Sequence, residues 1–233
     1  MTIRQRHRRY RGIARWAVSG LSTLLLLAIL PAAVSAARPD PILLVHGYRG
    51  SAGTWQEMIG RFAAESPKRT AVAISLPGQD NIANARAIRD FIVAKGWKRV
   101  DIVGQSMGGL SARQFIKFLD PLMVDTYVSL GTPQYGILSA CLLPSWYGGQ
   151  MCPSSGFMSN LNAGDDTPGA VYWTTIYSRT DGLVSTTSSR LDGGACHVYE
   201  DPGVPHNDMD NDATIFSHVL AATDRVCAGT FKP

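Results

Sequence analysis

The most informative stretch of the chain reads Val103-Gly104-Gln105-Ser106-Met107-Gly108-Gly109. A short β-branched run, residues 99–103, leads into it, and residues 110–119 follow with apolar side chains at helical spacing. The pattern predicts a strand, a very sharp turn at Ser106 and then a helix. The glycines on either side of the serine lack the Cβ atoms that would collide in such a turn. The hydroxyl would then stand clear of the backbone, beside helix N–H groups that favour negative charge. A glycine-rich turn around a helix-capping serine is the alternative interpretation.

Apolar strand runs alternate with helical patterns along the rest of the chain. The expected strands span 41–45, 71–76, 99–103, 124–130, 171–177 and 196–199, and the expected helices span 54–65, 82–95, 110–119 and 214–222. We expect Thr54 to cap the first helix, with Glu57 three residues later. Nearly continuous apolar strands that alternate with helices are typical of a parallel sheet covered on both faces. The sequence therefore predicts an α/β fold.

The first 36 residues have the pattern of a removable export signal. They contain arginines but no acidic residue, an apolar stretch at 17–30, and Val34-Ser35-Ala36, which fits the small-residue cleavage rule. An uncleaved N-terminal anchor is the alternative, although the uninterrupted apolar core, residues 24–30, is short for a membrane span. We expect a signal peptide at 1–36 and one secreted, monomeric domain at 37–233, with no transmembrane segment in the mature protein.

The charge balance changes when the leader is set aside. The chain has 22 Lys and Arg against 18 Asp and Glu, and the excess of basic residues lies in the leader. The remaining chain is slightly acidic and shows no basic patch. We therefore expect no nucleic-acid partner.

All four cysteines follow the leader, and an even number in an exported chain indicates disulfides. Three pairings are possible. We favour Cys141–Cys152, which would close a short surface loop, and Cys196–Cys227, which would tie the last strand to the C-terminal tail. A zinc site is the alternative, but no Cys-x-x-Cys pair or spaced Cys/His set supports it.

The stretch from residue 132 to residue 169 interrupts the alternation of strands and helices. It is rich in Gly, Pro and Ser, and it follows a strand, so it should lie on the side of the sheet where parallel strands end. We expect a disulfide-pinned cover or substrate-binding loop, and an inert surface insertion is an equal alternative. Its large apolar residues could contact a fatty chain or pack on the domain; they are Leu142, Leu143, Trp146, Phe157 and Met158.

A nucleophilic serine needs a base and an acid that orients the base. Asp181 stands just past the strand expected at 171–177, whereas Asp165 and Asp166 precede that strand and would emerge at its opposite end. We therefore predict Asp181 as the acid. A turn residue before Gly182 is the alternative role for Asp181.

Three histidines follow Ser106. His206 lies past the last expected strand and before the final helix, where a loop would carry the base. His197 lies within the strand and His218 within the helix, so a structural role suits them better. We predict His206 as the base.

A tetrahedral intermediate needs two backbone N–H donors for its oxygen. Met107, the residue after the serine, would supply one. The loop His46-Gly47-Tyr48 follows the first mature strand, and the main-chain N–H of Tyr48 is our second candidate. His46 would then hold this loop rather than act as the base.

Three acidic residues, Asp208, Asp210 and Asp212, alternate before the last helix. A calcium loop is one interpretation, but the glycine and the distal glutamate of an EF-hand are absent. A helix-capping run is the better interpretation. We expect neither a metal nor a cofactor.

Together these motifs resemble the small secreted bacterial lipases of the α/β-hydrolase superfamily, the class 2, Bacillus lipase A-like group. The matching segments are 43–48, 104–109, 174–184 and 203–206. The resemblance implies a minimal α/β-hydrolase with a mostly parallel, six-stranded sheet and helices on both faces. It also implies hydrolysis of carboxylic esters, with Ser106, Asp181 and His206 as the triad and Tyr48 and Met107 as the oxyanion donors.

The chain departs from that group at two places. Gln105 stands where such turns commonly carry histidine, and the region around Cys141 and Cys152 is longer than in the most compact members. We expect a secreted serine hydrolase that cleaves carboxylic esters, a triacylglycerol lipase or esterase, with a small-molecule ester or lipid as its substrate. The alternatives are an esterase for soluble esters, an acyltransferase of the same fold and a non-catalytic binding module.

Overall fold

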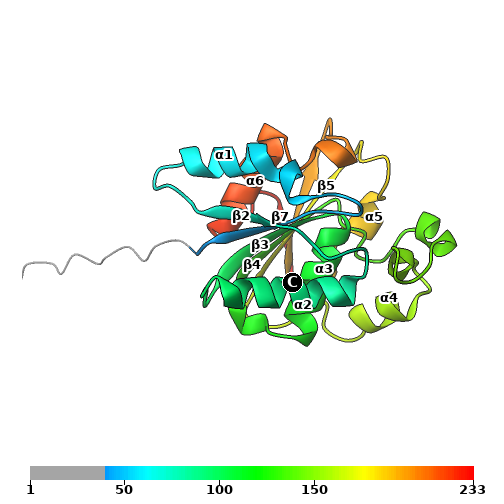
Figure 1. The fold of residues 1–233 in the computed structure, drawn as a ribbon. Coiled ribbons are helices and arrows are strands. Elements are labelled where there is room, and N and C mark those ends of the chain that lie inside the picture. The colour runs from blue at the N-terminus through cyan, green and yellow to red at the C-terminus, as the bar shows by residue number, and fades with distance from the viewer. Residues whose placement is uncertain (1–39) are drawn as a thin grey trace, which may run out of the picture. The chain divides into compact units, whose positions relative to one another are not determined.

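Seven strands form one sheet in the computed structural model, which describes residues 40–233 (Figure 1). They are β1 (Ile42–Val45), β2 (Ala71–Ile74), β3 (Val100–Gln105), β4 (Val124–Leu130), β5 (Tyr172–Ser178), β6 (Ala195–Glu200) and β7 (Thr230–Lys232). The strand order is β2-β1-β3-β4-β5-β6-β7, and every neighbouring pair is parallel except β6 and β7. The predicted α/β fold with a mostly parallel sheet is confirmed.

The prediction of six strands is wrong because it omits β7. This strand has three residues, all exposed, and it pairs antiparallel with residues 195–197 of β6. A strand this short at a sheet edge has no inward-facing apolar alternation. Its existence therefore depends on the partner strand and leaves no pattern in the sequence.

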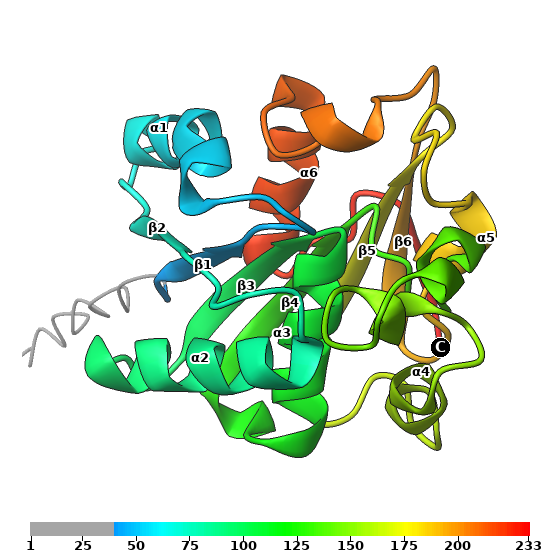
Figure 2. The ribbon, with the colours of Figure 1, turned by 45° about the vertical axis from the view of Figure 1, so that its right-hand side comes forward.

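Helices cover both faces of the sheet (Figure 2). The α-helices are α1 (Gln56–Ala64), α2 (Asn81–Ala94), α3 (Met107–Phe118), α4 (Gly156–Leu161), α5 (Thr186–Ser189) and α6 (Ala213–Thr223). The 3-10 helices are η1 (Ala52–Trp55), η2 (Pro121–Met123), η3 (Leu138–Leu142), η4 (Gly149–Met151) and η5 (His206–Asp208). α1 and α6 lie on one face, and α2 and α3 lie on the other.

Strand β1 shows why the strands read as apolar runs. Ile42 and Leu44 pack in the core beneath α1 and α6, while Leu43 and Val45 pack in the core beneath α2 and α3. All four side chains are fully buried. A strand buried on both faces needs apolar residues at every position, so the period-two alternation disappears.

Carboxylate caps begin two of the helices. Asp80 accepts hydrogen bonds from the first turn of α2, and Asp212 does so for α6. The expected capping role is therefore confirmed for Asp212. The expected cap at Thr54 is wrong, because the turn η1 begins before it and the Thr54 hydroxyl instead donates to the carbonyl of Ser51.

Two disulfides join Cys141 to Cys152 and Cys196 to Cys227. Within 132–169 the chain forms η3, η4 and α4, so this stretch contains more regular structure than the loop that its composition suggests. The expected signal peptide, residues 1–36, lies outside the described residues. Between residues 40 and 233, no helix is long and apolar enough to cross a bilayer.

Candidate active site

Ser106 occupies a strained turn between β3 and α3. Its backbone dihedral angles, φ of 54° and ψ of −126°, lie outside the regions that residues other than glycine normally adopt. A backbone conformation of this kind costs about 1–3 kcal/mol. A Cβ on Gly108 would collide with the carbonyl oxygens of Val45 and His46. A Cβ on Gly104 would lie 2.6 Å from the backbone of Gly109. The turn that was predicted from the two glycines is therefore present, and glycine is required at both positions.

Asp181 and His206 form a buried pair past the ends of β5 and β6. The Nδ1 atom of His206 lies 2.9 Å from Oδ2 of Asp181, and both residues are 6% exposed. A carboxylate accepts from the ring, so Nδ1 carries the proton and Nε2 is left with its lone pair. The main-chain N–H of His206 also donates to the carbonyl of Asp181, at 3.1 Å. This arrangement is the one that a base and its orienting acid require.

The other oxygen of Asp181 is held separately. Oδ1 accepts from the main-chain N–H groups of Leu183, at 3.0 Å, and Val184, at 2.6 Å. These two bonds fix the plane of the Asp181 carboxylate independently of its bond to His206. They leave Oδ2 to face the ring of His206.

Ser106 and His206 line the same cavity of about 280 Å³. In the described part of the chain, the Ser106 hydroxyl forms no hydrogen bond with His206. Such contacts are often long in the absence of substrate and tighten when it binds. The cavity is therefore the place where a reacting carbonyl would meet both groups.

Two backbone segments meet at the serine. Met107 is the first residue of α3, so its N–H has no partner within the helix. Tyr48 follows β1 and lines the cavity. A Cβ on Gly47 would lie 2.9 Å from Cβ of Ser106, so the loop that carries Tyr48 passes directly against the serine. The structure thus brings both predicted oxyanion donors to the edge of the nucleophile.

The other three histidines between residues 40 and 233 lie in structural positions. Nε2 of His46 accepts from the N–H of Leu76, so Nδ1 donates to the carbonyl of Gly47. Burial lowers the pKa of His46, which keeps this ring neutral. His197 contacts the carbonyl of Leu191, and His218 pairs with Glu200.

The insertion, residues 132–169, forms one wall of the cavity. Ile137, Ala140, Leu143 and Met151 line it from this side, next to the disulfide. Phe157 and Met158 instead pack on the start of α3. The insertion therefore both lines the cavity and packs on the domain.

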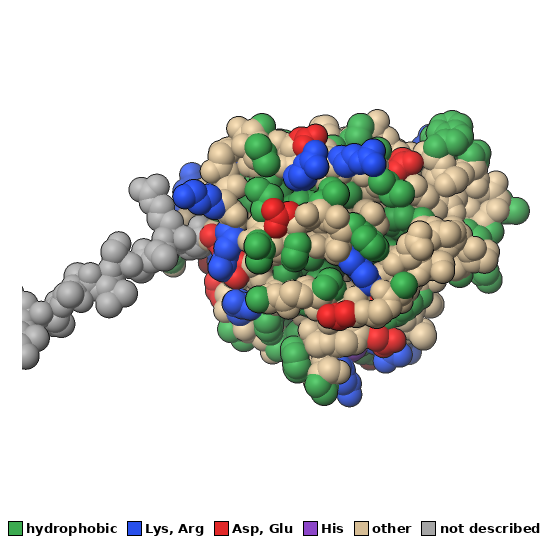
Figure 3. All heavy atoms as spheres, turned by 90° about the horizontal axis from the view of Figure 1, so that it is seen from below, with side chains coloured by type: hydrophobic (Ala, Val, Ile, Leu, Met, Phe, Trp, Pro, Cys, Tyr) green, Lys and Arg blue, Asp and Glu red, His purple; other side chains and the backbone are tan. Residues whose placement is uncertain are grey.

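The insertion exposes large apolar side chains. Leu142 is 91% exposed and Trp146 is 68% exposed. No charged residue occurs between Gly131 and Asp165. Few charged side chains are visible at the right-hand end of Figure 3, where the insertion lies.

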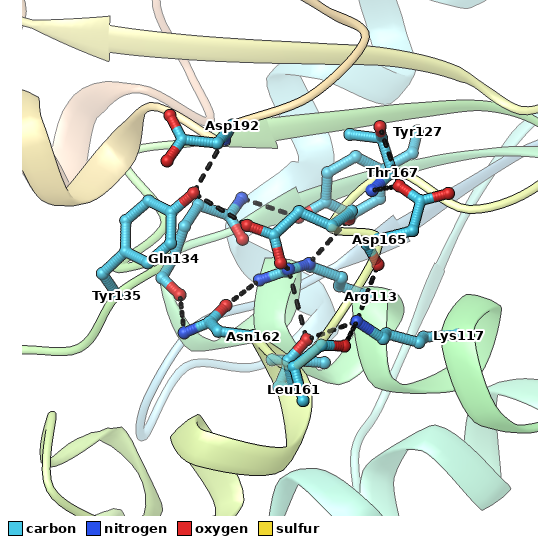
Figure 4. Close-up of polar contacts among 12 residues, drawn as sticks. Arg113, Lys117, Tyr127, Gln134, Tyr135, Leu161, Asn162, Asp165, Thr167 and Asp192 are labelled. Atoms are coloured by element: carbon cyan, nitrogen blue, oxygen red, sulfur yellow. Dashed lines mark hydrogen bonds and ion pairs between the residues drawn. The ribbon is translucent and has the colours of Figure 1, made fainter.

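Two cations of α3 hold the end of α4 (Figure 4). Arg113 is fully buried and donates to the carbonyl of Leu161, to the side chain of Asn162 and to Asp166. Lys117, one turn further along α3, donates to the carbonyls of residues 161, 163 and 165. We call this set the α3–α4 clamp. Sequence reasoning missed it, because an arginine in an amphipathic helix usually faces solvent.

Residues 42–230 match the alpha/beta hydrolase family. The chain belongs to this family. A stretch of 131 residues is 26% identical to the human lysosomal thioesterase PPT2, covering 53% of this chain and 43% of that protein. Another of 128 residues is 27% identical to a triacylglycerol lipase of Burkholderia plantarii, covering 48% of this chain and 36% of that protein. The chain spans less than half the length of these two relatives.

Solved structures show the same fold. The mature Bacillus licheniformis lipase BlEst2 matches with a TM-score of 0.65 at 19% identity, over 80% of this chain and 93% of that one. Aspergillus fumigatus lipase B matches with a TM-score of 0.66 at 20% identity, over 83% of this chain and 57% of that one. At these identities the likeness concerns the arrangement of the backbone.

Proposed function

We propose that this chain is a secreted serine hydrolase that cleaves carboxylic esters through an acyl-enzyme intermediate. One observation carries the proposal: a strained, glycine-flanked serine shares a cavity with a histidine whose Nδ1 is held by a buried carboxylate. A fold alone does not specify a reaction, but this combination of nucleophile, base and acid has a defined chemical use.

The proposed reaction proceeds in two halves. Ser106 attacks the acyl carbonyl while Nε2 of His206 takes its proton, and the imidazolium then protonates the leaving alcohol. Asp181 orients the ring and stabilises its positive charge. The main-chain N–H groups of Tyr48 and Met107 bind the oxyanion. Water, activated by His206, then releases the acid.

The lining of the cavity favours a substrate with an apolar acyl group. Its volume of about 280 Å³ is small for a ligand site, and Ile137, Leu143, Met151 and Leu183 line it. We propose short- to medium-chain esters as the best substrates. We also propose that the chain is a class 2 bacterial lipase and that it is exported. The two disulfides support export, because disulfides persist in oxidising compartments.

Hydrolysis of p-nitrophenyl esters tests the proposal directly. Purified protein without residues 1–36 is compared with Ser106→Ala, and Ser139→Ala serves as the control because it removes another hydroxyl from the same cavity. We expect Ser106→Ala to lower kcat by about 10³-fold or more and Ser139→Ala to stay close to wild type. An acyl thioester in the same series tests the similarity to the thioesterase. Equal activity of Ser106→Ala and wild type would rule the proposal out.

A further inference from the structure

The side chain of Gln105 makes a contact that the proposed mechanism does not use. Its Nε2 donates to the main-chain oxygen of His206 at 3.0 Å, and the residue is 8% exposed. A carbonyl can only accept, so the orientation of the amide is determined by its partner. Gln105 is the last residue of β3 and directly precedes the nucleophile.

This bond completes the fixation of His206. In the other two bonds, Nδ1 and the main-chain N–H of His206 both donate to Asp181, beyond β5. These two bonds fix His206 relative to Asp181, but neither bond fixes His206 relative to Ser106. The bond from Gln105 is the one that ties His206 to the strand that carries Ser106.

The same side chain also reaches the oxyanion loop. A Cβ on Gly47 would lie 2.8 Å from Oε1 of Gln105, so the amide packs against the backbone that leads into Tyr48. One residue therefore contacts the segment that carries the base and the segment that carries an oxyanion donor.

We propose that Gln105 is a positioning residue that sets His206 and the Tyr48 loop relative to Ser106. This inference rests on the proposed ester hydrolysis. The donated hydrogen bond is the property that matters, because an unpaired buried carbonyl at His206 would leave the loop free to shift. Displacing a catalytic group by about 1 Å costs about 10²-fold in rate, so the effect should fall on kcat rather than on KM.

Three substitutions separate the donor from the volume. Gln105→Met keeps the length of the side chain and removes the donor. Gln105→Glu removes the donor and places a carboxylate against the His206 carbonyl. Gln105→His restores an N–H in another shape. Gln56→Met, at an exposed position of α1, is the matched control.

We expect Gln105→Met to lower kcat by about 10- to 100-fold with KM within about twofold, and Gln105→Glu to lower it further. We expect Gln105→His to recover most of the loss, which packing alone would not explain. Hydrogen exchange of a peptide covering 203–208 provides a second measurement. It should become faster in Gln105→Met while exchange in β3 and β4 stays at the wild-type rate.

The outcomes are distinguishable from failure of the proposed function. If Ser106→Ala is inactive and Gln105→Met retains wild-type kcat, the positioning role is overturned and ester hydrolysis stands. Faster exchange throughout Gln105→Met, without recovery in Gln105→His, would show a role in folding and also overturn the proposal. If wild type and Ser106→Ala are equally active, both proposals fail.

Discussion

Asp181 shows how one residue can divide its contacts between structure and chemistry. Oδ1 is held by the backbone of residues 183 and 184, and Oδ2 faces the ring of His206. The backbone N–H groups demand an acceptor at Oδ1. A side chain that replaces Asp181 therefore places an acceptor against these N–H groups, and its other terminal atom faces the ring of His206.

Asp181→Asn should leave the fold intact and remove most of the activity. The amide oxygen would take the place of Oδ1, so the NH₂ group would face Nδ1 of His206. That arrangement moves the ring proton to Nε2, where it blocks the base. We expect kcat for p-nitrophenyl esters to fall by about 10³- to 10⁴-fold. Asp192→Asn, at an exposed carboxylate, is the control, and a loss below about tenfold in Asp181→Asn would contradict the assigned role.

Asp101, in β3, is a buried acid far from this chemistry. Burial raises the pKa of Asp101 to about 7. Arg69 opposes this shift, because its Nη2 lies 3.2 Å from Oδ2 of Asp101. An unfolded Asp titrates near pH 4. Between these values the folded protein binds more protons than the unfolded chain, so its stability falls as the pH rises toward 7.

Asp101→Asn should flatten this pH dependence. We expect the free energy of unfolding of the variant to change less between pH 5 and pH 8 than that of wild type. Urea unfolding at several pH values in this range measures the difference. Asp90→Asn, at an exposed carboxylate on α2, should keep the wild-type slope. Parallel curves for wild type and Asp101→Asn would show that Asp101 ionises normally.

At the scale of elements, the α3–α4 clamp joins the helix that starts at the nucleophile to the segment that walls the cavity. Arg113 has no exposed surface, and its partner Asp166 also accepts a hydrogen bond from Tyr135. Burial lowers the pKa of Arg113, and Asp166 opposes that change. The guanidinium stays charged, because its ordinary pKa is far above neutrality.

Arg113→Met should destabilise the protein strongly, because it leaves Asp166 without its cation in a nearly buried position. Breaking a buried pair by removing one partner costs about 3–5 kcal/mol. Arg89→Met removes an arginine from the exposed pair with Asp90 and should cost less than about 1 kcal/mol. Urea unfolding of both variants at neutral pH gives the comparison. Equal losses would mean that the clamp contributes no more than a surface pair.

The elements differ in how much of them the sequence predicts. Strand β1 is recognisable because burial on both faces leaves an unbroken apolar run. Helix α4 and the clamp are not, since they depend on contacts between residues some fifty positions apart, Arg113 and Asp166 among them. The short strand β7 and the turn η1 are not predicted from the sequence for the same reason. Their local pattern is weak, and contacts with distant residues determine the structure.

Across the whole molecule, the predicted site residues come from separate loops that meet where parallel strands end. Tyr48 follows β1, Ser106 follows β3, Asp181 follows β5 and His206 follows β6. Their chain order and their positions after strands were enough to select them, because the carboxyl ends of parallel strands share one edge. The bond from Gln105 to His206 could not be selected in this way, since it depends on the path of a loop rather than on strand order.

The two disulfides act on different parts of this assembly. Cys196 and Cys227 are separated by 31 residues, and their bond links β6 to the chain beyond α6. Cys141 and Cys152 are separated by 11 residues within the insertion, beside the cavity wall. In the loop-entropy description the longer loop contributes about 4 kcal/mol and the shorter about 3 kcal/mol.

Replacing each pair by alanine should therefore separate stability from substrate preference. We expect Cys196→Ala with Cys227→Ala to lower the free energy of unfolding by about 4 kcal/mol or more, because Cys196 is also fully buried in the core. The chain-length profile for p-nitrophenyl esters should keep its wild-type shape. Cys141→Ala with Cys152→Ala should instead broaden that profile toward longer acyl chains, because the wall formed by Ala140, Leu143 and Met151 loses its tether. An unchanged profile in this second variant would mean that the α3–α4 clamp and core packing hold the wall without the disulfide.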